Sequence, residues 1–339
     1  MAIYVVTGAT GFIGWTVTRI LISRGHEVRC PVRSLARATE VSDLGAQVQE
    51  VDFGKNGSLN ELVHGAEYLI HLAGATKAHS DEEFDRVNVG LVDKVLSACN
   101  SQAQPPASVL VSSVAASGPS GWDQARRESE TPNPISAYGR SKLKSEQLAL
   151  RYADRLPITI VRPAMVFGGH DRATLAMFQA IKRTRIHLSS GWKRRYFSLI
   201  FSDELAELLI AAATEGERLP TEGSGSNQQG VGVYHACRTN ALTYDEIGDF
   251  MAKAMGIRRF LKLHLFQPLP QIIGWAGDAY TSLTRKTSFL NSDKIRESLA
   301  TSWRFDSTKA QNQLRLKPET PVLHKFEEVV AKYRNQGWL

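Results

Sequence analysis

Two side chains four residues apart, Tyr138 and Lys142, could carry out acid–base chemistry. Pro132 and Pro134 precede them and helix-forming residues follow, so both side chains are expected on one face of a helix. A free tyrosine has a pKa of about 10 and is a poor base at neutral pH, but a neighbouring ammonium group stabilises its phenolate. The pair is therefore a candidate proton donor or acceptor, although the same spacing is common in surface pairs on helices.

Ser113 strengthens this interpretation because of its expected place in the fold. It directly follows an apolar run over residues 109–112 that is typical of a buried strand. Ligands of parallel α/β sheets bind beyond the carboxyl ends of the strands. Ser113, Tyr138 and Lys142 are therefore predicted to converge on one catalytic site.

A glycine-rich segment predicts a second site, for a dinucleotide. Residues 7–14 follow the first expected strand and open a helix, and their glycines form a GxxGxxG arrangement. The early glycines allow a tight turn and close approach to a pyrophosphate, the last allows close helix–sheet packing, and the helix N-terminus supplies N–H donors. The cofactor contacts expected from this loop are Gly8, Thr10, Gly11, Phe12, Ile13 and Gly14.

The end of the second expected strand favours NADP over NAD. An acidic residue there would accept from the ribose hydroxyl of NAD, whereas this chain has Arg33, which can bind the extra phosphate of NADP bidentately. NAD stays the alternative, since an arginine can also stack on adenine. Asp52 is a candidate acceptor for the adenine amino group, although a turn-forming aspartate explains it almost equally well. Leu72, Ala73 and Gly74, at the end of the fourth strand, leave room for the cofactor.

Alternating strand-like and helix-like segments position these residues. Strands are expected over residues 3–6, 27–32, 48–51, 68–72, 109–112 and 158–162, with a helix after each of the first five. This pattern predicts an α/β fold with a Rossmann-type doubly wound parallel sheet, helices covering both faces.

The second half of the chain has shorter elements. It predicts a smaller, mixed substrate-binding domain over residues 166–339, beside an NAD(P)-binding domain over residues 1–165. Residues 231–236 read as a strand, followed by a helix over 243–254 that Thr243 caps with Glu246 three residues on. A return of the segment 231–254 to the main sheet is compatible with this pattern.

These motifs together resemble the extended short-chain dehydrogenase/reductases of the NAD-dependent epimerase/dehydratase family. The resemblance covers nearly the whole chain, from the glycine motif, Ser113 and the YxxxK pair to Asn88 and the closing residues 337–339. It implies that Tyr138 exchanges the substrate proton and Ser113 holds the substrate oxygen. It also implies that Lys142 binds the nicotinamide ribose and lowers the tyrosine pKa, and that Asn88 lies near the active site. Hydride would move between nicotinamide and a carbinol carbon.

Departures from the family pattern narrow the expected reaction. Sugar-nucleotide dehydratases carry Thr-Asp-Glu where this chain has Ser-Ser-Val at 112–114, and sugar epimerases usually carry Tyr-Gly where it has Ser-Gly at 117–118. With Arg33, these residues look more like the dihydroflavonol-reductase and 3β-hydroxysteroid-dehydrogenase branches. The leading hypothesis is an NADP-preferring oxidoreductase for a ketone or secondary alcohol. A nucleotide-sugar epimerase with tightly bound NAD and a non-catalytic dinucleotide sensor are the alternatives.

The sequence evidence for residues that contact the substrate is weaker. Thr76 and His79 follow the fourth strand and Ser113 the fifth, where a pocket is expected, although a surface loop explains the first two equally well. Arg195 closes a basic stretch over residues 182–195 and is the best candidate for a substrate phosphate. A solvated basic loop is the simpler explanation of that stretch.

The amino-acid composition limits the classes of molecule that the protein is expected to bind. The net charge of +7 suits phosphate-bearing small molecules, and no aromatic–basic motif points to nucleic acid. Three distant cysteines, Cys30, Cys99 and Cys237, predict neither a disulfide nor a metal site, and a cytoplasmic location is the simplest. The resemblance implies a homodimer.

A membrane-spanning helix is not expected, because no run of about 18 apolar residues occurs. Residues 258–283 form a broken apolar stretch that begins with two arginines. It is compatible with a pair of helices, lying either on a membrane surface or over a substrate pocket.

Overall fold

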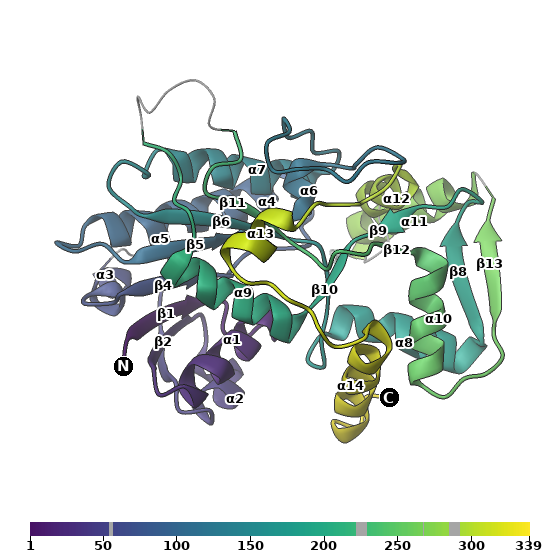
Figure 1. Cartoon of the computed structure of the whole chain (residues 1–339), viewed down its shortest axis with the longest axis horizontal. Coiled ribbons are helices and arrows are strands. Elements are labelled where there is room, and N and C mark those ends of the chain that lie inside the picture. The colour runs from purple at the N-terminus through teal and green to yellow at the C-terminus, as the bar shows by residue number, and fades with distance from the viewer. Residues whose placement is uncertain (54–56, 222–228, 267, 285–291) are drawn as a thin grey trace.

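The computed structural model describes residues 1–53, 57–221, 229–266, 268–284 and 292–339 (Figure 1). Its centre is a seven-stranded sheet in which every neighbouring pair is parallel, in the order β11-β6-β5-β4-β1-β2-β3. The strands are β1 (Ile3–Thr7), β2 (Glu27–Val32), β3 (Gln47–Glu50), β4 (Tyr68–His71), β5 (Ala107–Val111), β6 (Ile158–Pro163) and β11 (Val233–Ala236).

Alternation of buried side chains along these strands divides the core into two layers. Tyr4 and Val6 of β1 pack into one apolar cluster, and Val5 between them packs into another on the opposite face. The first cluster is shared with α1 (Phe12–Ser23), α2 (Thr39–Ser42), α9 (Ser202–Glu215) and α13 (Thr308–Gln313). The second is shared with α3 (Gly57–Val63), α5 (Gly90–Asn100) and α7 (Ala137–Leu150). The predicted Rossmann-type doubly wound fold is confirmed.

The segment that begins at residue 231 does return to the main sheet. Its strand β11 pairs with β6, so that Tyr234 lies beside Val161. The helix that follows is α10 (Tyr244–Ala254), and it begins as predicted: the Thr243 hydroxyl accepts from the Glu246 N–H, and the Glu246 carboxylate accepts from the Thr243 N–H.

Three helices of the second half enclose an aromatic core. They are α8 (Arg172–Thr184), α10 and α14 (Val322–Asn335), and they pack around Phe167, Phe178, Phe201, Phe326 and Tyr333. Three strand pairs flank them: β7 (Met165–Phe167) with β10 (Leu199–Phe201), β9 (Tyr196–Phe197) with β12 (Leu242–Thr243), and β8 (Ile186–Ser190) with β13 (Leu261–Leu265). Short turns of helix complete the chain: η1 (Leu35–Arg37), α4 (Asp81–Phe84), η2 (Asp85–Val89) and α6 (Val114–Ser117).

The expected helix pair over residues 258–283 is wrong in its first half. Residues 261–265 form the strand β13, and only α11 (Leu269–Thr284), followed by α12 (Ser292–Leu299), is helical. The reason is the alternation Leu-Lys-Leu-His-Leu, which has the period of a strand and turns Lys262 and His264 to the side of α10. Within the described residues, no helix is both long and apolar enough to cross a membrane.

Candidate active site

The loop between β1 and α1 leaves a backbone surface that can accept a diphosphate. Gly8 has a φ of 71°, and a methyl group added to it would lie 2.8 Å from the Ala73 nitrogen. A methyl group on Gly14 would lie 2.2 Å from the Gly8 carbonyl oxygen, so neither position admits a larger residue. Thr10 and Gly11 are exposed, and the fully described helix α1 has no side-chain cap and no acid in its first turn. This loop therefore fits the pyrophosphate of a dinucleotide.

Other residues predicted to contact the cofactor lie along the same edge of the sheet. Phe12 and Ile13 form the first turn of α1 and are half-buried. Arg33 and Asp52 are exposed just beyond β2 and β3, which pair with each other. No side chain or carbonyl of the described residues engages the Arg33 guanidinium. It is thus open to an anionic ligand.

Buried polar atoms line the ends of β4 and β5. The Thr7 hydroxyl lies 2.8 Å from His71 Nδ1 and accepts from the Ala73 N–H at 3.2 Å. His71 Nε2 and the Ser112 hydroxyl are buried and have no hydrogen-bond partner among the described residues. Burial and the nearby Lys142 lower the pKa of His71 to about 3, so its imidazole is neutral at pH 7. Neutral, unsatisfied polar groups in this place fit a bound polar molecule such as the dinucleotide.

Gly74, Asn88 and Lys142 meet beside this edge. A methyl group on Gly74 would lie 2.9 Å from Asn88 Oδ1 and 3.4 Å from Lys142 Nζ. The Asn88 amide accepts from the Ala75 N–H at 2.7 Å, and it donates to the Ala75 carbonyl at 3.1 Å and to the Ser141 hydroxyl at 2.9 Å. Asn88 therefore holds the loop after β4 against α7, on which Lys142 stands.

Close backbone packing brings Tyr138 to Ser113. Ser113 caps α6 by accepting from the Ala115 N–H at 3.1 Å, and Ser136 caps α7 by accepting from the Gly139 N–H at 3.1 Å. A methyl group on Gly139 would lie 2.4 Å from the Ala115 carbonyl oxygen, so only glycine lets the two helices approach this closely. The Tyr138 phenol lies within hydrogen-bonding reach of the Ser113 hydroxyl. The structure thus brings the predicted trio together.

Burial controls the protonation of the two titratable members. It raises the pKa of Tyr138 to about 12; a hydrogen bond with Ser113 opposes this rise and Glu297 adds to it. Burial also lowers the pKa of Lys142 to about 8, against the opposing effect of the Glu146 carboxylate. Lys142 is 8% exposed and donates to the Val111 carbonyl at 3.0 Å. At pH 7 the site therefore holds a neutral phenol and an ammonium group.

A buried ion pair behind the site was missed by sequence reasoning. Arg162 donates from Nε and Nη2 to the two carboxylate oxygens of Glu146, at 2.9 and 2.6 Å, and from Nη1 to the Ser117 hydroxyl at 3.0 Å. Both members of the ion pair have only 5% of their side chains exposed. Glu146 stands one helical turn after Lys142, and this spacing was the available signal.

Helix α12 covers Tyr138 and was also missed by sequence reasoning. Asp293 accepts from the Ala137 N–H at 2.7 Å, at the N-terminus of α7. The Lys294 ammonium lies 5.4 Å from the centre of the Tyr138 ring and is paired with Glu297 at 2.7 Å. No local pattern links residues 137 and 293, so only the folded structure could reveal this contact.

The structure does not bring the other predicted substrate contacts together with Ser113, Tyr138 and Lys142. Thr76 and His79 are exposed in the segment between β4 and α4, and the His79 N–H donates to Glu83 at 2.8 Å. Arg195 is partly buried and donates to the carbonyl oxygens of Ser190 and Ala300. Its guanidinium thus joins its own loop to the segment that follows α12.

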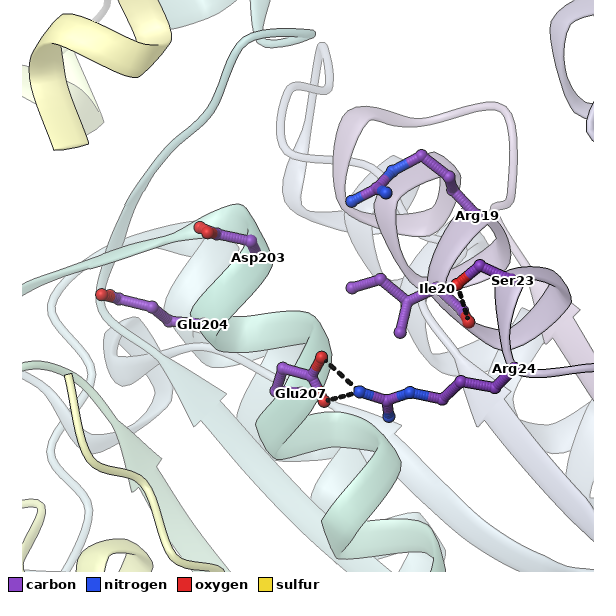
Figure 2. Close-up of a pocket in the computed structure, with 7 residues that line it drawn as sticks. All are labelled: Arg19, Ile20, Ser23, Arg24, Asp203, Glu204 and Glu207. Carbon is purple, nitrogen blue, oxygen red and sulfur yellow. Dashed lines mark hydrogen bonds and ion pairs between the residues drawn. The ribbon is translucent and has the colours of Figure 1, made fainter. Parts of the chain in front are cut away.

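A pocket between α1 and α9 lies apart from these residues (Figure 2). It is lined from the carboxyl half of α1, the end away from the glycine loop, and from the start of α9. Its acidic side chains are all paired: Glu207 with Arg24 at 2.6 Å, Glu204 with Arg238 at 2.6 Å, and Asp203 with Lys325 at 2.5 Å. These pairs join helices to each other and to the loop after β11, and we assign them no catalytic part.

Comparison with known proteins agrees with this arrangement. The NAD dependent epimerase/dehydratase family matches residues 4–224. The chain belongs to this family. It is thus an NAD(P)-dependent enzyme of the extended short-chain dehydrogenase/reductase type, as its motifs predicted.

Several proteins are similar to this chain along nearly its whole length. The ceramide reductase of Caulobacter vibrioides is 31% identical over 337 residues, covering 98% of this chain and 95% of that protein. A putative dihydroflavonol 4-reductase of Synechocystis is 33% identical over 349 residues, covering 99% of this chain and 96% of that protein. Among solved structures, a UDP-glucose 4-epimerase of Thermotoga maritima, in complex with UDP-glucose, shares the fold with a TM-score of 0.75 at 18% identity. The similarity covers 98% of this chain and 99% of the epimerase chain.

Proposed function

We propose that this protein is an NADP-preferring reductase that converts a lipophilic ketone to a secondary alcohol. The observation that carries the proposal is the meeting of Ser113, Tyr138 and Lys142 at the carboxyl end of β5, with the tyrosine neutral and the lysine charged. A neutral phenol is a proton donor, so this resting state suits reduction of a carbonyl rather than oxidation of an alcohol.

In the proposed mechanism the substrate carbonyl oxygen accepts hydrogen bonds from the hydroxyl groups of Ser113 and Tyr138. The bound dinucleotide supplies the hydride. As negative charge develops on the carbonyl oxygen, Tyr138 transfers its phenolic proton to that oxygen. The ammonium group of Lys142 stabilises the phenolate that remains, and its second task is to hold the nicotinamide ribose. Solvent then reprotonates Tyr138.

The cofactor preference rests on Arg33. Its exposed guanidinium follows β2 at the position where the fold recognises the 2′ substituent of the adenosine ribose. A guanidinium binds phosphate through two parallel hydrogen bonds, whereas a ribose hydroxyl offers one acceptor.

The substrate class rests on the relatives. The Caulobacter protein is named for a ceramide, a long-chain lipid, and it spans nearly all of this chain. Long-chain ketones are therefore the first compounds to test. We place the enzyme in the cytoplasm as a homodimer, and its three buried free cysteines agree with a reducing compartment.

A nucleotide-sugar epimerase is the second candidate, supported by the shared fold of the UDP-glucose 4-epimerase. Arg195, the residue expected to bind the substrate diphosphate, instead donates to the carbonyl oxygens of Ser190, in its own loop, and of Ala300, directly after α12. This observation favours the reductase.

Cofactor titration separates the two candidates. The purified protein is first denatured to look for released nucleotide and is then titrated with NADPH and NADH by calorimetry. The reductase predicts at least about tenfold tighter binding of NADPH, equal to about 1.4 kcal/mol, and loss of that preference in Arg33→Ala. Release of stoichiometric NAD from the purified protein would instead support the epimerase.

A further inference from the structure

We propose that the ribbon β8–β13 and helix α11 form a docking face for an anionic lipid membrane. The proposal goes beyond reductase activity and does not depend on it. Three groups of apolar side chains carry it, on neighbouring elements at one end of the molecule, the right-hand end in Figure 1.

The first group lies on the outer side of the ribbon. The inner side packs on α10, where His187 lies against Gly248, and Lys262 pairs with Asp249 at 2.6 Å. The outer side carries Leu188, Leu261 and Leu263, whose exposed fractions are 52%, 55% and 39%. Leu188 and Leu263 are partners in the parallel register, so their side chains adjoin.

The second and third groups lie at one end of this ribbon. Trp192 and Phe266 follow the two strands there, and each is 74% exposed, although the Trp192 ring stacks on His264 with ring centres 5.0 Å apart and so lies at the edge of the outer side. Leu269, Ile272 and Trp275 follow on α11, spaced by three residues and exposed by 46%, 49% and 66%. Together the three groups form the apolar face. Side chains of this size are rarely exposed in such number unless they meet a partner.

The charge around the apolar face indicates which partner. Residues 182–195 contain six Lys or Arg and residues 258–277 contain three, and neither segment contains Asp or Glu. Arg183, Arg185, Arg258 and Arg259 are exposed near the start of the ribbon, and Lys193 and Arg194 at its end. A surface with exposed Trp, Phe and Leu among basic side chains matches the interface of an anionic bilayer. A second copy of this chain would instead bring like charges together.

The apolar face is connected to the active site through one helix. A methyl group on Gly274 of α11 would lie 3.0 Å from Ile295 of α12, so the two helices pack closely. Helix α12 in turn places Lys294 over the Tyr138 ring. The cover of the active site therefore lies directly behind the proposed lipid-facing helix.

Vesicle flotation with the full-length protein tests the proposal. Vesicles of phosphatidylcholine alone are compared with an equimolar mixture of phosphatidylcholine and phosphatidylglycerol. We expect binding to the anionic vesicles, weakened by salt, and little binding to the neutral ones. The double variant Arg258→Gln/Arg259→Gln should bind about 30-fold more weakly, since each cation near an anionic surface contributes close to one factor of five. The triple variant Trp192→Ser/Phe266→Ser/Trp275→Ser should lose binding.

Matched substitutions away from the apolar face serve as controls. Arg151→Gln/Arg155→Gln removes two exposed cations at the end of α7, and Leu150→Ser can be set against Leu269→Ser because both leucines are 46% exposed. The controls Arg151→Gln/Arg155→Gln and Leu150→Ser should bind vesicles like the wild type, whereas Leu269→Ser should bind them more weakly. NADPH binding, for which none of the substituted residues is an expected contact, verifies that every variant is folded.

Two results would overturn the proposal. One is equal binding, or no binding, to both kinds of vesicle. The other is a concentration-dependent oligomer that the triple variant abolishes, which would assign the apolar face to a second copy of the chain. Neither result bears on cofactor preference or ketone reduction, so failure here is distinguishable from failure of the proposed function.

Discussion

Replacing Lys142 with methionine should make the protein more stable and catalytically inactive. The side chain is 8% exposed, and burial lowers the pKa of its ammonium group from 10.5 to about 8. A difference of about 2.5 pKa units corresponds to roughly 3 kcal/mol of free energy lost by burying the charge. Methionine has a similar length and no charge, and it forgoes only the hydrogen bond to Val111, which contributes about 1 kcal/mol. The expected net gain at pH 7 is therefore about 2 kcal/mol.

The gain should depend on pH. Because the folded-state pKa of Lys142 is lower than the unfolded-state value, the folded protein binds this proton more weakly than the unfolded chain. The wild type therefore becomes more stable as the pH rises from about 8 to about 10.5, where the lysine is neutral in the folded state. The advantage of Lys142→Met should disappear across this range.

Urea unfolding at pH 7 and near pH 10.5 measures both effects, with cofactor absent. Lys144→Met is the matched control, because Lys144 stands on the same helix with 52% of its side chain exposed. Its substitution should change the free energy of unfolding by less than about 1 kcal/mol at either pH. A variant Lys142→Met that is less stable than the wild type at pH 7, or whose advantage is the same at both pH values, would refute the reasoning.

Three further predictions concern the site. The value of kcat/KM for ketone reduction should fall as the pH rises through about 8, because Lys142 loses its proton there; a profile flat to pH 10 would contradict this role. Glu146→Gln should destabilise the fold by about 3–5 kcal/mol by leaving Arg162 buried and unpaired, whereas Glu207→Gln, at an exposed pair, should cost under about 1 kcal/mol in the same urea assay. Gly14→Ala should abolish NADPH binding in calorimetry, since its methyl group would overlap the Gly8 carbonyl; unchanged binding would show that the loop can yield.

The sequence was sufficient for the main sheet and for much of the site. Each strand of the first half is a short apolar run between turns, and the observed strands begin and end within about two residues of those expected. The glycine loop, Ser113 and the YxxxK pair could be placed because each adjoins the end of a predicted strand or the start of a predicted helix.

Contacts between distant segments could not be predicted in this way. Strand β13 is stabilised by pairing with β8, about 75 residues earlier, and its short alternating pattern lies within a longer apolar stretch that suggested helices. The cover formed by α12 depends on Asp293 meeting the N-terminus of α7, 156 residues away. The Arg162–Glu146 pair joins β6 to α7; the helical spacing places Glu146 on the face of Lys142, but it does not show that Arg162 meets Glu146.

Transfer of deuterium from NADPH labelled at the nicotinamide C4 tests the central claim most directly. The account predicts that the wild type moves the label to the carbinol carbon of a long-chain ketone, and that Tyr138→Phe does so about 10²- to 10⁴-fold more slowly while still binding NADPH. Equal rates in the two proteins would contradict the assigned role of Tyr138. Interconversion of UDP-sugar epimers by tightly bound NAD, with no transfer from NADPH to any ketone, would contradict the account as a whole.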